Sequence, residues 1–399
     1  MPDPVRSEDA PLRAGHDSLP QLALLFLRLG ATAFGGPAGH IAIMEDEFVR
    51  RRRWLSRETF LDLLSASNLI PGPNSTEMAI HVGFVRAGIP GLLLAGVCFI
   101  LPAAILVTAM AWAYVRFGQL PAAVALLYGV KPVVIAIIAQ ALWRLGRTAV
   151  KSALLVAMGA LCLALGFLGV NELLILAGAG VAGAGWVVTR SGSRRSLGVF
   201  LPIWRGLPVK IPALLAVGAA TATAGLWPLF LVFVKIGSVI FGSGYVLLAF
   251  LRADLVVARG WITDAQLVDA IAIGQVTPGP VFTAATFIGY LLRGPAGAVV
   301  ATVAIFLPAF VLVALSGPLV PRIRKSAVAA GFLDGVNVAS LALMAVVGTQ
   351  LARATLVDAW TVLLAAASAV LLFRFRVNSV WLVLAGALVG AAAYWLRAA

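Results

Sequence analysis

A long stretch near the start of the chain is repeated about halfway along it. Residues 26–73 match residues 207 positions later, so that Trp54 falls on Trp261. After a one-residue deletion the match continues at an offset of 206, and Gly83 falls on Gly289. A membrane protein made of two similar halves usually builds one site between them and moves a solute through it. If the copied stretch lies in a membrane, the repeat therefore indicates a secondary transporter.

The composition places the chain in a membrane. Of its 399 residues, 61% are hydrophobic and 12% are charged, and the mean hydropathy is +1.02. A soluble domain has about a quarter of its residues charged. Apolar runs of about 20 residues, the length that crosses a ~30 Å hydrocarbon core, follow one another through both halves. Such continuous runs favour helices over the short alternating strands of a β-barrel. We predict an all-α polytopic membrane protein.

The repeat and the linker between its copies divide the chain. We predict a disordered tail over residues 1–19, a first membrane repeat over 20–189, a basic linker with an extra apolar segment over 190–228, and a second membrane repeat over 229–399. The extra apolar run, 211–226, has no counterpart in the first half. Whether it crosses the membrane or lies at its surface is left open.

Basic residues occupy different loops in the two halves. In the first half they follow the first and fourth apolar segments, as at Arg53 and Lys151, whereas in the second half they follow the third and fifth, as at Lys325 and Arg374. Cytoplasmic loops are enriched in Lys and Arg, so the halves must be oppositely oriented. The sequence predicts two inverted-topology repeats with about ten membrane-crossing helices. The same loop charges require one segment of the first half not to cross.

A Pro-Gly-Pro motif in the second segment of each half explains how that segment fails to cross. The two copies are Pro71, Gly72 and Pro73, and Pro278, Gly279 and Pro280. Proline removes a backbone donor and clashes with the preceding turn, so a helix breaks there. Broken helices at membrane depth are tolerated only where protein or water satisfies the freed groups. We expect discontinuous or re-entrant segments at both motifs.

A helix that starts at such a break is a candidate anion site. We predict that Asn74 caps the first helix, with Glu77 completing a capping box, and that Thr283 is the nearest polar residue in the second half. The start of a helix presents unpaired N–H groups and a positive dipole end. Two of them from opposed halves would face one oxyanion. The alternative is that both motifs are kinks needed only for packing.

Glycine-rich segments form a second repeated pair. They are Phe34, Gly35 and Gly36 in the first half, and Phe241, Gly242, Ser243 and Gly244 in the second. Glycine permits positive φ and close backbone approach. These segments are predicted either to line the pore with amides or to allow close helix packing.

Charged groups inside the apolar segments are candidates for substrate contact or proton transfer. Arg28 aligns with Lys235, and each is predicted either to contact the substrate or to extend to the headgroup layer; Lys131, whose counterpart is Asn337, is a third candidate. The candidates for carrying a proton are Asp62, Asp269, Glu77 and His81. For Glu77 the alternative role is helix capping, and for His81 it is a structural interior histidine.

Several function classes are excluded or disfavoured. The net charge of +14 fits either an anionic cargo or ordinary basic cytoplasmic loops. No soluble basic domain is present to bind nucleic acid. Motifs for ATP phosphates and for a nucleophilic serine are absent from the sequence, so transport would use an ion gradient. We expect no catalytic residues, no cofactor and no metal.

The motifs resemble those of the chromate ion transporter family. The resemblance rests on Phe34-Gly35-Gly36-Pro37 with His40 close by, Trp54-Leu55-Ser56, Asn68-Leu69-Ile70-Pro71-Gly72-Pro73, and the corresponding second-half series. It covers nearly the whole chain from about residue 20. Two-domain members of this length are similar to fusions of two short homologues in opposite orientation.

The resemblance implies efflux of chromate across the cytoplasmic membrane, driven by the proton motive force. Chromate is close to sulfate in shape and charge, so a sulfate or other oxyanion porter is an alternative. An anion channel is another, as is an intramembrane enzyme. The implied partners are a chromate-like or sulfate-like oxyanion, protons and the lipid bilayer, with no nucleic acid. The assembly is left open between a monomer and a homodimer.

Overall fold

Helices build every regular element that the structure describes. The computed structural model covers residues 18–33, 36–118, 120–191, 224–241, 246–316 and 326–398. Most of the predicted tail and of the 190–228 linker, including 211–223, lies outside these ranges. The predicted all-α class is confirmed.

The same order of elements occurs twice. The first half contains α1 (Leu19–Thr32), α2 (Gly36–Glu45), the π-helical η1 (Asp46–Arg51), α3 (Arg57–Ser67), α4 (Asn74–Phe117), α5 (Pro121–Ala149), α6 (Ala153–Phe167) and α7 (Glu172–Ser191). The second contains α10 (Leu226–Val239), α11 (Leu247–Leu251), the π-helical η4 (Arg252–Val257), α12 (Asp264–Val276), the 3-10 helix η5 (Val281–Thr283), α13 (Ala284–Ser316), α15 (Ala327–Thr355), α16 (Ala359–Arg374) and α17 (Ser379–Ala398). Even the π-helical segments recur at corresponding positions.

The long helix α4 folds back on itself. Gly88 adopts φ 61° and ψ −146°, a conformation that essentially only glycine tolerates. A Cβ at Gly83 would collide with the carbonyl of Gly91, so the residues on either side of the turn lie against each other. We call the two antiparallel parts α4N (74–86) and α4C (89–117). In the second half Gly294 makes the same turn between α13N (284–292) and α13C (295–316).

The Pro-Gly-Pro motif lies at the tip of a re-entrant hairpin formed by α3 and α4N. The guanidinium of Arg86, at the end of α4N, lies 4.7 Å from the ring centre of Trp54, just before α3. The start of α3 and the end of α4N therefore lie together, and the motif that joins the two helices lies at the opposite end of the hairpin. With 11 residues, α3 is about 16 Å long, roughly half of a hydrocarbon core. The predicted re-entrant segment is confirmed.

The two halves run in opposite directions. Gly96, early in α4C, packs against Phe310, late in α13C. Tyr114, late in α4C, packs on Phe287 with ring centres 5.1 Å apart, and the neighbouring Thr286 lies beside Thr302. Corresponding helices are thus antiparallel, as inverted repeats require. Five described helices are long and apolar enough to cross a membrane, and five shorter apolar helices accompany them; the total of about ten crossings stays a prediction.

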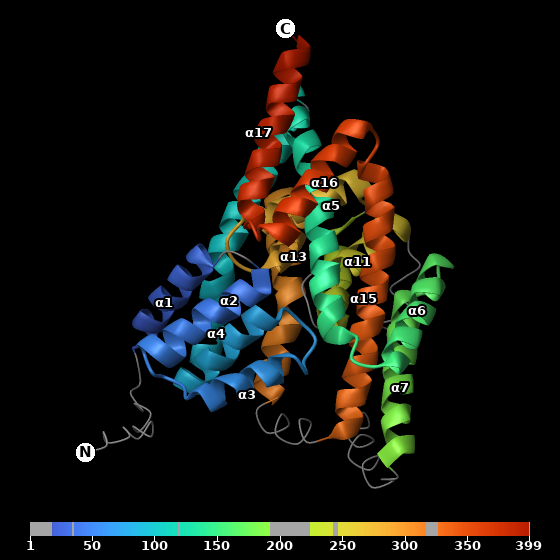
Figure 1. Ribbon diagram of the computed structural model, residues 1–399. Coiled ribbons are helices and arrows are strands. Elements are labelled where there is room, and N and C mark those ends of the chain that lie inside the picture. The colour runs from blue at the N-terminus through green and yellow to red at the C-terminus, as the bar shows by residue number, and fades with distance from the viewer. Residues whose placement is uncertain are drawn as a thin grey trace, which may run out of the picture.

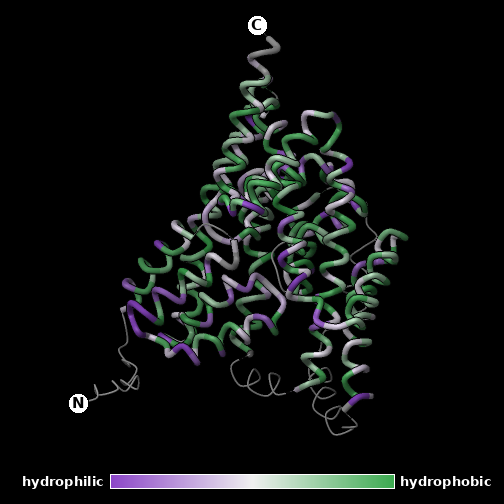
Figure 2. Tube along the Cα trace, viewed as in Figure 1, coloured by the Kyte–Doolittle hydropathy of each residue, from purple (hydrophilic) through white to green (hydrophobic). Residues whose placement is uncertain are grey.

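The broken helices and the long helices form two regions (Figure 1). The region of α1–α4 lies on one side, whereas α5–α7 and α15–α17 pack on one another as a helical scaffold. Hydrophobic residues run along most helices, and hydrophilic ones gather along α1–α3 (Figure 2). One buried cluster joins the second-half hairpins to the scaffold, whereas the first-half hairpins have a cluster of their own.

Candidate functional site

The two Pro-Gly-Pro motifs meet at the interface between the halves. The Gly72 N–H donates to the carbonyl of Ile240 (2.7 Å), and the Gly279 N–H donates to the carbonyl of Ala33 (2.9 Å). Ala33 and Ile240 are counterparts in the repeat, so the contacts are reciprocal, as a two-fold relation requires. Each motif therefore uses backbone of the opposite half to satisfy its glycine.

Both motif glycines are required by space and by conformation. Gly72 has φ 146° and Gly279 has φ 96°, values that side chains disfavour. A Cβ at Gly72 would collide with Glu77 and lie 3.4 Å from Ala309, and a Cβ at Gly279 would lie 2.8 Å from Ala103. Ala103 and Ala309 are again counterparts, so each tip is seated against the crossing helix of the other half.

The glycine-rich segments are only partly described. Gly36 begins α2 with φ 71°, and Phe241 is half-buried. The remaining predicted residues of these segments, Phe34, Gly35, Gly242, Ser243 and Gly244, lie outside the described residues.

The predicted capping of α4 is wrong. Pro73 occupies the N-cap position, so Asn74 is already helical and makes no cap. Its amide nitrogen instead donates to the Asn68 side chain (2.6 Å). The Glu77 carboxyl has no hydrogen-bond partner among the described residues, so the capping box is absent there. In the second half the Thr283 hydroxyl donates to the carbonyl of Pro280 (2.8 Å).

Buried polar atoms without partners gather beside the first motif. Glu77 is fully buried, and its carboxyl reaches the Cα of Gly72. Within the described residues, its two oxygens, the Thr76 hydroxyl and Nε2 of His81 have no hydrogen-bond partner. Buried polar groups in folded proteins almost always have a protein, water or ion partner. This part of the site is therefore suited to a polar ligand or an ion.

His40 connects three elements at the same place. Its ring lies between the Ser75 hydroxyl (3.1 Å from Nδ1) and the Ala33 carbonyl (3.0 Å from Nε2). A carbonyl only accepts, so Nε2 must carry the proton, and Nδ1 then accepts from Ser75. Sequence reasoning used His40 only for the family resemblance and not as a site residue. The signal was its position four residues after Gly36, where the second half has Leu247 after Ser243.

The predicted substrate cation Lys235 faces a carboxylate. Its Nζ lies 2.8 Å from Asp254 of η4, and Arg259 lies 3.0 Å from the same carboxylate. All three side chains are largely buried. Lys235 is therefore part of a structural ion cluster between α10 and η4.

A matching cluster surrounds Glu47 in the first half. Arg51 and Arg52 lie 2.8 and 2.7 Å from its carboxylate, and Arg28 contributes to the same field. These acids escaped sequence reasoning, although Glu47 and Asp254 align at the 207-residue offset between aligned basic residues. Arg28 and Lys235 thus lie beside matching clusters, but Arg28 is exposed whereas Lys235 is largely buried.

Lys131 and Asp269, predicted for different roles, lie together. Nζ of Lys131 is 3.4 Å from one Asp269 oxygen, and the Tyr114 hydroxyl donates to the other (2.9 Å). Asp269 is buried, whereas its counterpart Asp62 is exposed on α3. Tyr114 was missed, because nothing in the sequence pairs it with a residue 155 positions later.

Nothing in the described residues forms a metal site. No group of three or more His, Cys, Asp or Glu side chains in these ranges is placed to hold a metal ion. The unpartnered polar atoms beside Gly72 lie where the starts of two helices meet.

Comparisons with known proteins identify relatives of the chain. The sequence profile described as chromate transporter matches residues 20–184 and 227–391, one match in each half. The chain is 34% identical to the chromate transport protein of Cupriavidus metallidurans over 94% of each chain. It is 34% identical to the probable chromate transport protein of Synechococcus elongatus over 87% of this chain and 88% of that one. It is 32% identical to the chromate transport protein of Pseudomonas aeruginosa over 94% of this chain and 92% of that one.

No solved structure matches the chain. The profile nevertheless covers both halves, and the relatives align from end to end. The resemblance noted in the motifs is confirmed, and the chain belongs to the chromate transporter family.

Proposed function

We propose that this multi-pass membrane protein exports chromate across the cytoplasmic membrane and is driven by the proton motive force. The observation that carries the proposal is the reciprocal bonding of Gly72 and Gly279 across the halves. It brings two helix starts together at the tips of re-entrant segments. Between inverted repeats, such a place is where transporters bind their substrate.

Backbone amides after Pro73 and Pro280 would hold the oxyanion. The first turn of a helix leaves N–H groups without intrahelical partners, and its dipole favours negative charge. The polar side chains in the first turns after the motifs are Asn74, Ser75, Thr76 and Thr283, and the Glu77 carboxyl lies in the same turn of α4. Lys131 and Lys235 each face a carboxylate, so we assign them, with Arg28, the secondary role of setting the positive field.

Glu77 and His81 would carry the coupled proton. They lie one helical turn apart on α4N, and both have buried atoms without described partners. The second half has Ala284 and Ile288 in these places. A carboxyl that gains a proton beside the anion changes the charge the anion meets, which couples the two movements. Asp62 and Asp269 remain candidates for a relay farther from the motifs.

The relatives support chromate as the substrate, since three of them carry it in their names. Sulfate has the same tetrahedral shape and charge. Amides and hydroxyls recognise those features and not the central atom, so a sulfate or other oxyanion porter is the second candidate.

The test is uptake of radiolabelled chromate into inside-out vesicles, with and without an uncoupler and with excess sulfate. We expect uptake that the uncoupler abolishes. Glu77→Gln should lose the uncoupler-sensitive part, because the amide cannot exchange a proton. Asp334→Asn on α15 removes an acid whose ion pair with Lys151 lies outside the site and should leave uptake unchanged.

Three outcomes would reject parts of the proposal. Uptake that is insensitive to the uncoupler would indicate an anion channel. Equal inhibition of labelled uptake by excess sulfate and by the same excess of unlabelled chromate would remove selectivity for chromate. Absence of uptake in vesicles that contain folded protein would reject chromate export.

A further inference from the structure

A single imidazole ring, that of His40, connects the contact between the tips to the start of α4. Its Nε2 donates to the Ala33 carbonyl, which also accepts the N–H of Gly279 from the second-half motif. A carbonyl oxygen has two lone pairs, so these two donors fill it. On the other side of the ring, Nδ1 lies 3.1 Å from the Ser75 hydroxyl, in the first turn of α4.

The neutral ring occupies the hydroxyl hydrogen of Ser75. Because Nε2 must carry the ring proton in order to donate to a carbonyl, Nδ1 of neutral His40 is an acceptor. Ser75 therefore donates its one hydrogen to Nδ1, and His40 is the only partner of this hydroxyl among the described residues. In this state Ser75 has only lone pairs left to present, and lone pairs repel an oxyanion.

A second proton on the ring reverses this hydrogen bond without moving a heavy atom. Nδ1–H of the imidazolium donates to the Ser75 oxygen, and the hydroxyl hydrogen becomes free to turn elsewhere. Nε2 keeps its bond to Ala33, so the contact between the tips is the same in both states. Both protonation states of His40 thus have partners for both ring nitrogens.

Ser75 lies where a freed hydroxyl hydrogen can meet the anion. It is the second residue of α4, in the same turn as the N–H groups proposed to hold the oxyanion. The next residue, Thr76, is fully buried, and its hydroxyl has no partner in the described part of the chain. His40 and Ser75 are buried as well. A buried imidazolium is costly without a nearby anion, so the anion and the proton each favour the binding of the other.

Other ionisable side chains on the elements around His40 set the field that its proton meets. They are Glu77, His81 and Arg86 on α4N, Arg28 on α1, Glu45 on α2, and Asp46, Glu47, Arg50 and Arg51 on η1, which packs on α2. Glu77 is two residues from Ser75, and its ionised form would favour the imidazolium. Residues 278–283 of the second half carry no charge. Helix α4C presents the ring of Phe99, whose centre lies 5.9 Å from that of His40.

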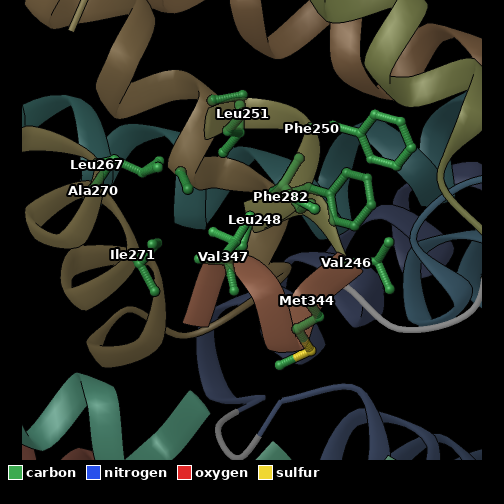
Figure 3. Close-up of a cluster of buried hydrophobic side chains, with 14 of the residues drawn as sticks. Val246, Leu248, Phe250, Leu251, Leu267, Ala270, Ile271, Phe282, Met344 and Val347 are labelled. Carbon is green, nitrogen blue, oxygen red and sulfur yellow. The ribbon is translucent and has the colours of Figure 1, made fainter. Parts of the chain in front are cut away.

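The second half cannot perform the same reversal. The counterparts of His40 and Ser75 are Leu247 and Phe282, and both belong to the buried cluster that joins the second-half hairpins to the scaffold. Figure 3 shows Phe282 among other apolar side chains of this cluster, which include Leu248. Neither counterpart has a hydroxyl or a ring nitrogen, so a reversible donor exists in the first half only.

We propose that His40 is a proton-binding site whose protonation turns the Ser75 hydroxyl toward the transported oxyanion. The inference deepens the proposed transport function and rests on it. His40 is a positioning residue, because it acts on the anion through Ser75, and its proton is additional to those assigned to Glu77 and His81. A dianion that leaves with one such proton still moves net negative charge outward, so the electrical part of the proton motive force would drive it.

The test is the affinity of the purified full-length protein for chromate, measured by titration calorimetry in detergent between about pH 6 and about pH 8. Chromate itself titrates near neutral pH, so each variant is compared with the wild type at the same pH. One linked proton changes Kd by up to about tenfold per pH unit. We expect the wild type to bind more tightly as the pH falls. His40→Gln, whose amide nitrogen can keep the bond to Ala33, should lose this one-proton slope.

Two variants of Ser75 separate the proposed role from a structural one. Ser75→Ala should weaken binding roughly tenfold at the acidic end of the range. It should have little effect at the basic end, where neutral His40 already occupies the hydroxyl. Ser75→Thr keeps a hydroxyl and should retain the wild-type slope. A structural role alone would instead lower the affinity of Ser75→Ala by the same factor at every pH.

Two outcomes would overturn the proposal. One is the wild-type slope in folded His40→Gln and folded Ser75→Ala; if His40→Gln does not fold, the slope of Ser75→Ala decides alone. The other is loss of the one-proton slope in His81→Gln and its retention in His40→Gln, which would place the proton on the other histidine.

The proposed transport function fails separately, because binding in detergent uses no gradient. The expected slopes without chromate flux in vesicles would reject only export. Uncoupler-sensitive flux with wild-type slopes in the variants of His40 and Ser75 would reject only the proton site.

Discussion

The two halves carry the same breaks and yet differ in how they are covered. The first-half hairpins form a separate buried cluster around Phe26, Phe48 and Phe60, whereas the corresponding second-half residues join the cluster of the scaffold. The repeated prolines and glycines therefore fix where the chain turns. They do not fix what the turns pack against, which depends on how the halves are placed around one site.

The halves also differ in chemistry. His40, Glu77 and His81 of the first half are replaced by Leu247, Ala284 and Ile288. At these three positions the second half thus has apolar side chains, whereas the first half has groups that can change charge. Near-symmetric geometry thus carries ionisable side chains in one half only at these three positions.

Of the three comparisons, mutation of the ion clusters should give the largest difference in lost unfolding free energy between the halves. Asp254→Asn leaves Lys235 and Arg259 buried without their carboxylate, and breaking a buried pair in this way costs about 3–5 kcal/mol. Glu47→Gln leaves the more exposed Arg51 and Arg52, so the loss should be below about 1 kcal/mol. Unfolding of the purified protein in detergent measures both. Equal losses would mean that the two clusters are equally buried in solution.

Mutation of the motif glycines should give a smaller difference in lost stability between the halves. Both Gly72→Ala and Gly279→Ala place a side chain at positive φ, a strain of about 1–3 kcal/mol. Gly279→Ala also meets Ala103 and the Gly30 carbonyl, which cannot move away, whereas Gly72→Ala meets the end of the Glu77 side chain. We expect Gly279→Ala to be the less stable variant in the same unfolding measurement. The reverse order would show that Glu77 is more firmly held than its missing partners imply.

Mutation of the helix caps should lower stability by almost the same amount in the two halves. Ser56 caps α3 and Thr263 caps α12 at counterpart positions, and each accepts a hydrogen bond from the third helical residue. Replacing either by alanine should cost about 1 kcal/mol. Thr263 also takes part in a capping box, so its loss should be slightly greater. A much larger loss at Ser56 would indicate that α3 is held by its cap more than by packing.

Much of the fold could be predicted because its signals are local. Two prolines around one glycine break a helix, so the tips at 71–73 and 278–280 followed directly from sequence, whereas single prolines such as Pro102 and Pro132 lie inside α4 and α5. Loop charge gave the inverted orientation, which the antiparallel α4C and α13C confirm. The capping prediction at Asn74 failed because Pro73 took the N-cap position first, which shifted the helix start by one residue.

The site was less predictable because its contacts span the whole chain. Gly72 pairs with Ile240, and Tyr114 pairs with Asp269, and neither pairing has a spacing rule. The roles predicted for Lys131 and Asp269 were separate, whereas the structure places the two side chains together. Alignment of the halves would have revealed the Glu47 and Asp254 clusters, since acids recur there between repeated bases.

The reciprocal hydrogen bonds between the tips also determine when the site can form during biosynthesis. Gly279 pairs with Ala33, and the ribosome adds the 245 intervening residues in about 10–50 s at typical rates. Throughout that interval the Ala33 carbonyl lacks its final partner, and the Gly72 amide lacks its own until Ile240 has been made. Both groups need another hydrogen-bond partner until the second half has been made. A pause or a premature stop in translation after the linker would therefore leave a membrane-inserted half whose turns are complete and whose site is not.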